Sequence, residues 1–362
     1  MLAGENMLSD SNTSANKPNS GRCRMTDNTK PIIAVTMGDP AGVGPEITCK
    51  MFAEKTVYNF CRPLVVGDTA SLSEGMTVGK VSLQLNSINK PSESKFVPGI
   101  IDIIDLHNVD IGSLKMGEPQ AMAGKACVEY IKKAVELATD KEVDAIVTGP
   151  INKKAMNMGG YKYSGHTELL ADLTKTKDFA MLLVTGPLKV IHVSTHVSLV
   201  EAIRRVQKDR IMTVIRLADQ ALRQLGVSHP RIAVAGLNPH AGEDGMFGNE
   251  EIETITPAIE AVKKAGIDVS GPIAPDTVFM RAKKGEFDVV VAMYHDQGHV
   301  AIKMLGFELG VNVSIGLPII RTSVDHGTAY RRAGRKLGTG DPSSLIEATR
   351  LAAQMATSKA NA

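Results

Sequence analysis

The sequence lacks a long apolar run. No stretch approaches the roughly 18 to 20 apolar residues that a membrane-spanning helix needs, and the N-terminus has neither the basic start nor the apolar stretch of a secretory signal. An excess of charge of one sign is also missing, because 41 Lys and Arg stand against 39 Asp and Glu. Nothing therefore indicates a nucleic-acid-binding or membrane surface, and we expect a cytoplasmic protein.

Cysteine is scarce and irregularly placed. Cys23, Cys49, Cys61 and Cys127 form no CxxC pair, which indicates neither a disulfide framework nor a thiolate metal site. Residues 1–24 are rich in Ser, Asn and Gly and lack hydrophobic periodicity. We expect them to be a disordered extension or leader outside the fold.

From position 31 onward, short β-branched runs alternate with longer segments in which apolar residues recur every three to four positions. This alternation predicts an α/β protein with mostly parallel sheets. With 362 residues, 43% of them hydrophobic, the chain is long enough for two cores. Strands are predicted at 32–36, 63–66, 100–106, 145–148, 179–184, 190–194, 232–235, 289–292 and 311–315, and helices at 120–138, 209–225, 250–265 and 343–356.

Histidines follow three of these strands. His196, His240 and His295 stand in "HVSTH", "NPHAG" and "YHDQG", each at the carboxyl end of an apolar run, where the chemistry of parallel sheets gathers. Three neutral imidazoles with an open position suit zinc, manganese or cobalt, or magnesium if more oxygen ligands join. The alternative is that each is a lone polar loop residue, and spacing alone does not decide.

Two other histidines are excluded from this set by spacing. Residues i and i+4 of a straight strand lie about 13 Å apart, so His192 and His196 are not expected to share an ion. His295 and His299 would share a face only on a helix, which we expect Gly298 to disfavour.

Anion-binding features form a second group. "YSGHTELLADL" predicts a helix entered through His166 and Thr167, whose imidazole, hydroxyl and free helix-start amides suit a phosphate; a threonine N-cap and a surface histidine are the alternative. Arg321 begins a predicted polar loop and is either an anion clamp or a surface arginine. The glycine loop "GDPAGVGPE" is not a dinucleotide fingerprint and predicts a tight strand-to-helix turn.

Taken together and in order, the motifs resemble the 4-hydroxythreonine-4-phosphate dehydrogenase family over nearly all of residues 31–357. They are "VTMGDPAGVGPEI", "TGPINK", "SGHTE", "GLNPHAGE", "PDT", "AMYHDQG" and "GVNVSIGLPIIRTSVDHGTA". Because His299 follows "YHDQG" where the vitamin B6 branch usually has an apolar residue, the chain looks more like a paralogous branch acting on D-threonate or D-erythronate 4-phosphate. "GDPAGVGPE" and "DHGTAYRRAG" also look, more distantly, like loops of isocitrate and isopropylmalate dehydrogenases.

The resemblance implies a two-domain α/β fold like that of isocitrate and isopropylmalate dehydrogenases, with the active site in the interdomain cleft at a dimer interface. Residues 25–155 and 320–362 would form a nicotinamide-binding domain, and 156–319 a domain for metal, substrate and dimerisation. The family is similar in being a homodimer with shared sites, in which the histidine matching His196 comes from the partner chain.

The resemblance also implies roles for particular residues. The metal ligands would be His196, His240 and His295, and the acids Asp276 and Asp296 would line the same pocket. Substrate contacts would be His166, Thr167, Lys303, Asn312 and Arg321, and cofactor contacts His326, Gly327, Thr328, Ala329 and Gly334.

The implied reaction is a metal-dependent, NAD-linked oxidation of the 3-hydroxyl of a 4-phosphorylated four-carbon hydroxy acid, followed by decarboxylation. D-Threonate or D-erythronate 4-phosphate would give dihydroxyacetone phosphate. The alternatives are 4-hydroxy-L-threonine 4-phosphate in pyridoxal phosphate biosynthesis, a phosphate acyltransferase of similar fold, and a binding protein that has lost catalysis.

Overall fold

The structure is a computed structural model that describes residues 29–163, 165–306, 310–333 and 338–360. The predicted N-terminal extension, Cys23 and Gly334 lie outside the described residues. The other three cysteines are buried free thiols, as the sequence indicates.

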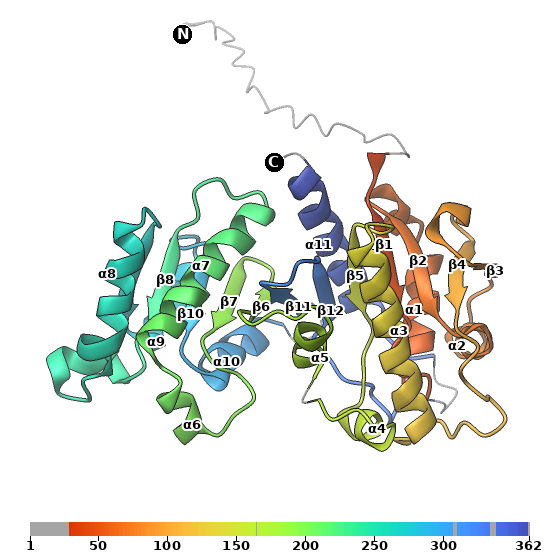
Figure 1. The fold of residues 1–362 in the computed structure, drawn as a ribbon, viewed down its shortest axis with the longest axis horizontal. Helices are drawn as coiled ribbons and strands as arrows, with labels where there is room; N and C mark the ends of the chain where they lie inside the picture. The colour runs from red at the N-terminus through yellow and green to blue at the C-terminus, as the bar shows by residue number, and fades with distance from the viewer. Residues whose placement is uncertain (1–28, 164, 307–309, 334–337, 361–362) are drawn as a thin grey trace, which may run out of the picture.

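One twelve-stranded sheet runs through the described chain in the order β3-β4-β2-β1-β5-β12-β11-β6-β7-β10-β8-β9 (Figure 1). Neighbouring strands are parallel except β12–β11, β11–β6 and β6–β7 in the middle of the sheet, which are antiparallel. The predicted α/β class with mostly parallel strands is confirmed. The strands are β1 Ile32–Thr36, β2 Arg62–Gly67, β3 Gln84–Ile88, β4 Ile100–Asp105, β5 Ala145–Thr148, β6 Ala180–Thr185, β7 Leu188–His192, β8 Ile232–Ala235, β9 Val269–Ile273, β10 Val289–Ala292, β11 Val311–Ile315 and β12 Arg321–Val324.

All nine predicted strands are present, and three more were missed. β3 and β9 are the edge strands, where half-exposed polar, glycine and proline residues replace a continuous apolar run. β12 is central but begins with Arg321, which we expected to start a polar loop. That prediction is wrong, because the polar residues of β12 are buried between β5 and β11.

The helices cover both faces of the sheet (Figure 1). In the β6–β10 half, Val289 and Val291 pack in the cluster that contains α7 and α8, while Val290 and Ala292 face α9 and α10. The helices are α1 Gly44–Ala53, α2 Thr69–Gly79, α3 Ala121–Thr139, α4 Lys153–Met158, α5 His166–Leu173, α6 Leu199–Arg204, α7 Lys208–Gln224, α8 Thr256–Lys264, α9 Pro275–Lys283, α10 His295–Leu305 and α11 Ser343–Ala360. Shorter turns are η2 Lys55–Asn59, η3 Pro91–Glu93, η4 Pro239–Gly245 and the π-helical η5 Glu251–Ile255.

Two segments far apart in sequence build the β1 half of the sheet. Strands β1 to β5 come from residues 32–148, and β12 returns beside β5 with α11 packed on both. Residues 180–315 supply the other half, which joins the first through the antiparallel β12–β11 pair. The division into two domains stays a prediction.

Helix α10 differs from the sequence expectation. It begins at His295 and contains His299, so the prediction that Gly298 keeps both imidazoles off one helix is wrong. Gly298 instead allows α10 to approach β7, because a Cβ there would lie 2.4 Å from Nε2 of His192. The two histidines therefore lie about one turn apart on the same face of one helix.

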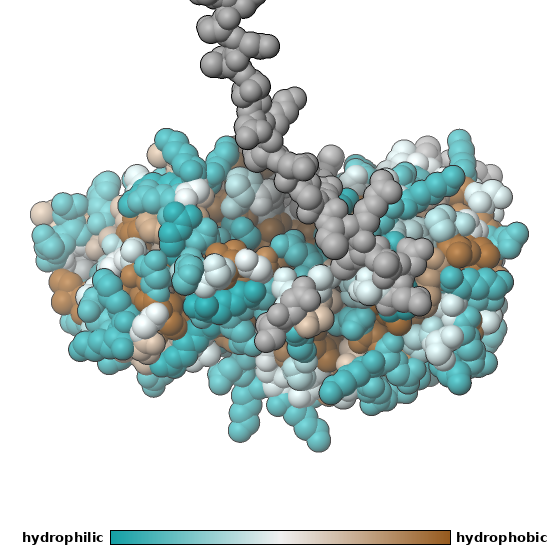
Figure 2. All heavy atoms as spheres, turned by 90° about the horizontal axis from the view of Figure 1, so that it is seen from above, coloured by the Kyte–Doolittle hydropathy of each residue, from teal (hydrophilic) through white to brown (hydrophobic). Residues whose placement is uncertain are grey.

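The upper face of the molecule, which carries the C-terminal end of α11, is largely hydrophilic with small apolar areas between the polar side chains (Figure 2). Among the described residues, no helix is long and apolar enough to cross a membrane.

Candidate metal and phosphate site

The carboxyl ends of β7, β8 and β10 lead directly into the segments that carry the predicted metal ligands. Within one chain the rings of His196 and His295 come together, with their centroids 5.6 Å apart. With metal–nitrogen bonds of about 2.1 Å, two imidazoles on one ion have centroids roughly 5 to 6 Å apart, so this pair fits a shared ion. Both histidines line a cavity of about 510 Å³ between the start of α10 and α6.

Asp296 orients the ring of His295. Nδ1 of His295 lies 2.7 Å from Oδ1 of Asp296, and the same hydrogen bond lowers the pKa of Asp296. Since a carboxylate only accepts, Nδ1 donates this hydrogen bond, and in the neutral ring Nε2 is then the nitrogen whose lone pair can bind a metal ion.

His240 stands apart from this pair. It lies in η4, directly after β8, and its ring contacts Phe247 with centroids 6.2 Å apart. Within the residues described for one chain, no three His, Cys, Asp or Glu side chains gather as a metal site. The structure of a single chain thus brings two of the three predicted ligands together.

Two histidines that spacing had set aside pack behind His295. The ring of His299 stacks on that of His295 at 3.6 Å, and the buried ring of His192 lies 4.8 Å from that of His299. Burial, followed by the neighbouring imidazoles, lowers the pKa of His192 to about 3 and that of His299 to about 4. Both rings are therefore neutral near pH 7 and form a packed support for the first turn of α10.

Arg321 is buried, which excludes the surface alternative. Its guanidinium donates to Oγ1 of Thr148 at 2.6 Å, Oγ of Ser314 at 2.9 Å and Oδ1 of Asn312 at 3.3 Å. Burial lowers the pKa of Arg321 to about 9, so it stays charged near pH 7. The structure thus joins two predicted substrate residues, Asn312 and Arg321. Sequence reasoning missed Thr148, although it ends the quoted strand before "GPINK".

Arg321 and the side chains that it bonds form what we call the cationic cluster, and the start of α5 lies beside it. Helix α5 begins at His166 with Gly165 as its N-cap and no side-chain cap, so the threonine N-cap alternative is wrong. Burial, and then the charge of Arg321, lowers the pKa of His166 well below its usual range. Nε2 of His166 is inaccessible to water and has no hydrogen-bond partner among the described residues, as expected for an atom that awaits a ligand.

Glu168 links the cationic cluster to the imidazoles. The negative charge of its carboxylate favours the charged form of Arg321 and so raises the pKa of that guanidinium. The same carboxylate lies 3.7 Å from Nδ1 of His196. Thr167 and His196 line one small cavity beside it. Predicted phosphate contacts and predicted metal ligands are therefore neighbours.

Lys303 and Asp276 occupy other positions. Lys303, on α10, lies close enough to Asp325 and His299 to shift the pKa of each. Asp276 is exposed in the first turn of α9, which packs against η4.

The loop after β12 lies against the glycine loop after β1. The amide of Val43 donates to the carbonyl of Thr328, and the hydroxyl of Tyr330 donates to Asp39 at 2.6 Å. Burial raises the pKa of Asp39 to about 6. A cavity of about 370 Å³, large enough for part of a nucleotide, opens between the two loops. His326, Gly327 and Ala329 line it, together with Val43, Ile47, Arg332, Gly340, Asp341 and Ser344.

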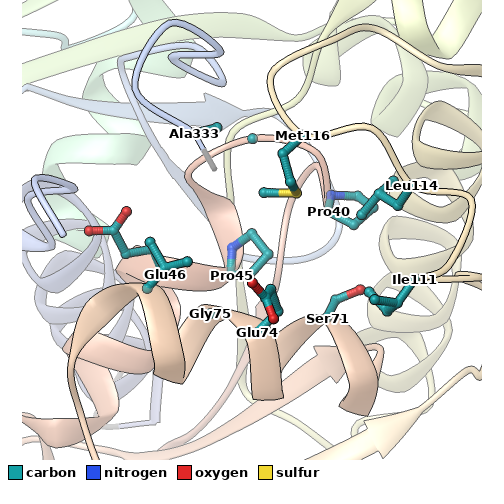
Figure 3. A pocket seen from close by; sticks show the side chains of 12 residues that line it. Pro40, Pro45, Glu46, Ser71, Glu74, Gly75, Ile111, Leu114, Met116 and Ala333 are labelled. Carbon is teal, nitrogen blue, oxygen red and sulfur yellow. The ribbon is translucent and has the colours of Figure 1, made fainter. Parts of the chain in front are cut away.

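A smaller hollow lies between α1, α2 and the loop that carries Ile111, Leu114 and Met116, whose side chains face Pro45 and Ser71 across it (Figure 3). It encloses about 20 Å³, room for roughly one water molecule, and is too small for a substrate.

Comparison with known proteins decides the family. Residues 59–352 match the model of the family described as pyridoxal phosphate biosynthetic protein PdxA. The chain belongs to the PdxA family. All the predicted site residues fall inside the matched range.

Named relatives of this PdxA-family chain cover most of its length. D-threonate 4-phosphate dehydrogenase of Cupriavidus necator is 50% identical over 332 residues, which cover 91% of this chain and 98% of the relative. The enzyme of the same name from Pectobacterium atrosepticum is 51% identical over 326 residues, covering 90% and 99%. The solved structure of 4-hydroxythreonine-4-phosphate dehydrogenase from Klebsiella pneumoniae is 47% identical, with a TM-score of 0.83 over 91% of this chain and 99% of that one.

Proposed function

We propose that the protein is an NAD-linked oxidative decarboxylase of a phosphorylated four-carbon hydroxy acid, with D-threonate 4-phosphate as the leading substrate. One observation carries this proposal: the buried Arg321 and the half-buried His166 adjoin the His196 and His295 pair through Glu168. The phosphate of one small acid and its hydroxyl to be oxidised would need two neighbouring sites of this kind, one cationic and one able to hold a divalent ion. The relatives named for D-threonate 4-phosphate support the choice of acid.

The cationic cluster would bind and orient the substrate. Arg321 presents a charged fork already fixed by three side chains, and His166 contributes a neutral ring whose Nε2 has no hydrogen-bond partner within the described part of the chain. Such remote binding aligns the reacting carbon and disfavours analogues without the phosphate.

The imidazoles would hold a divalent cation. His295 has a free Nε2 lone pair because Asp296 fixes its tautomer, and His196 faces it at a suitable distance. When bound, the ion supplies stabilisation of negative charge on the oxygen of the substrate. Asp296 orients His295, which leaves Asp276, beside the turn of His240, as the candidate for proton transfer.

A second copy of the chain would complete the site. Within the residues described for one chain, two of the three ligands pair, and large apolar side chains are exposed beside both parts of the site. Exposed apolar side chains next to polar site residues are typical of subunit interfaces. They are Leu199, Val200 and Ile203 on α6 near His196, and Met246 and Phe247 near His240.

The nicotinamide cofactor would bind the cavity between the two loops. His326, Gly327 and Ala329 line that cavity, and Thr328 bonds the glycine loop that forms its other wall. NAD is the form we expect.

The proposal is tested by measuring NAD reduction with the 4-phosphates of D-threonate, D-erythronate and 4-hydroxy-L-threonine, each with and without a metal chelator. We expect fastest turnover with D-threonate 4-phosphate, release of carbon dioxide, and loss of activity with chelator that added zinc, manganese or cobalt restores. Preference for 4-hydroxy-L-threonine 4-phosphate would favour the function named for the Klebsiella structure. Acyl transfer to phosphate without NAD reduction would contradict the proposal.

A further inference from the structure

The turn that carries His240 has an unusual backbone. Five consecutive residues, from His240 to Asp244, have positive φ angles, between 44° and 85°. Only one of them, Gly242, is a glycine, and each of the others brings its Cβ close to the following carbonyl. Such a conformation persists only where surrounding contacts fix it.

Glu251 supplies these contacts from inside the turn. Its carboxylate is buried, and Oε1 accepts hydrogen bonds from the backbone amides of Leu237 at 2.7 Å and Asn238 at 2.8 Å. Oε2 accepts from Nδ2 of Asn238 at 2.9 Å. These bonds fix the two residues just before Pro239, where the turn begins.

The turn closes tightly around this carboxylate. A Cβ on Gly242 would lie 2.8 Å from Oε2 of Glu251, so only glycine allows this approach. Glu251 also opens the π-helical turn η5 that leads into α8. π-helical turns often occur at functional sites.

The same segment is tied to the turn of His295. Gln297 accepts from the amide of Met293 at 2.7 Å and donates to the carbonyl of Gly236 at 2.7 Å. The ends of β8 and β10 are therefore held at a fixed separation, and Glu251 extends this fixed frame to His240.

We propose that Glu251 is a positioning residue that holds the left-handed turn of η4, so that His240 is fixed as a metal ligand before the ion binds. This inference rests on the proposed metal site. In this role Glu251 would not bind the metal ion. It would hold the backbone that carries His240, so that this ligand is already in place when the ion arrives.

The test compares Glu251→Ala and Glu251→Gln with Glu253→Ala, which removes an exposed carboxylate from the same π-helical turn. Co²⁺ affinity is measured by calorimetry on the full-length protein, together with the visible spectrum of the bound ion, NAD affinity and the melting temperature. We expect Glu251→Ala to weaken Co²⁺ binding about 10- to 100-fold and to change the spectrum. NAD affinity should stay at the wild-type value.

The Co²⁺ affinity of Glu251→Gln should lie between those of wild type and Glu251→Ala. Its oxygen still accepts from the two amides, but its NH₂ group meets the donor Nδ2 of Asn238. Glu253→Ala should bind Co²⁺ like wild type. If Glu251→Ala does not fold, Glu251→Gln decides, since wild-type Co²⁺ affinity and spectrum in that variant would overturn the positioning role.

A His240→Ala variant separates this inference from the proposed function. If His240→Ala keeps wild-type Co²⁺ affinity, the metal site itself is wrong and the role of Glu251 falls with it. If His240→Ala loses the ion while Glu251→Ala and Glu251→Gln keep it, the metal site stands and only the positioning role is overturned.

Discussion

Gly298 lies where the first turn of α10 crosses β7. A Cβ at this position would come within 2.4 Å of Nε2 of His192 and 2.7 Å of Cγ1 of Val190. His192 cannot withdraw, because its ring is buried and its Nδ1 faces the carbonyl of Met181. The placement of His295 one turn earlier therefore depends on this glycine.

Gly298→Ala should lower the free energy of unfolding. Overpacking a core contact costs about 1–3 kcal/mol, whereas alanine gains about 1 kcal/mol over glycine in helix propensity, so the net loss of stability should be up to about 2 kcal/mol. Urea unfolding measures the difference. Gly79→Ala is the control, because the nearest atom to its Cβ would lie at 3.5 Å. Equal stability of Gly298→Ala and wild type would disprove the packing role.

The contact between His192 and His299 could not be predicted from the spacing of residues along the sequence. The four-residue separation of His192 and His196 argued against a shared ion on one straight strand, but β7 ends at His192, and spacing could not reveal that His192 contacts His299. That contact arises because β7 and β10 are neighbours, with His192 opposite Ala292 in register. Contacts across strands depend on strand order, which a single sequence does not state.

At the scale of elements, β12 carries the most polar chemistry. Arg321 on this strand reaches Thr148 at the end of β5 and Ser314 on β11, so three neighbouring strands fix one guanidinium. The hydroxyls of Thr148 and Ser314 accept hydrogen bonds from the guanidinium, and its charge, after burial, helps to lower the pKa of His166.

Arg321→Ala should weaken the binding of the phosphorylated acid far more than the binding of NAD. A hydrogen bond to a charged group contributes about 1.5–3 kcal/mol, which corresponds to roughly a 10- to 150-fold increase in KM for the acid. Steady-state kinetics with each substrate varied in turn measures both effects. Arg321→Lys keeps the positive charge but loses the planar guanidinium, so its KM for the acid should lie between those of wild type and Arg321→Ala. Equal losses for the acid and for NAD would argue against a phosphate role.

The elements that were predicted well share one property. Strands such as β5, β8 and β10 are short, mainly apolar runs buried on both faces, and their predicted bounds agree with the structure. The edge strands β3 and β9 lack this pattern because one side of each is open. The polar β12 is stabilised by partners that are remote in sequence, which no local pattern reveals.

At the scale of the whole molecule, the site is assembled over long distances. Arg321 and Thr148 are 173 positions apart, and the candidate site combines residues from α5, α10, β7 and β12. Ordered motifs pointed to the family, whereas the adjacency of phosphate and metal residues required the fold. The grouping of three imidazoles stays a prediction, because one chain gathers two of them.

Anomalous X-ray scattering from crystals of the zinc- or cobalt-loaded protein tests the central claim most directly. We predict one ion per site, within about 2.1 Å of a nitrogen of His196, His240 and His295, with both subunits of a dimer contributing ligands. An ion held by other side chains, or no bound ion under metal saturation, would contradict it.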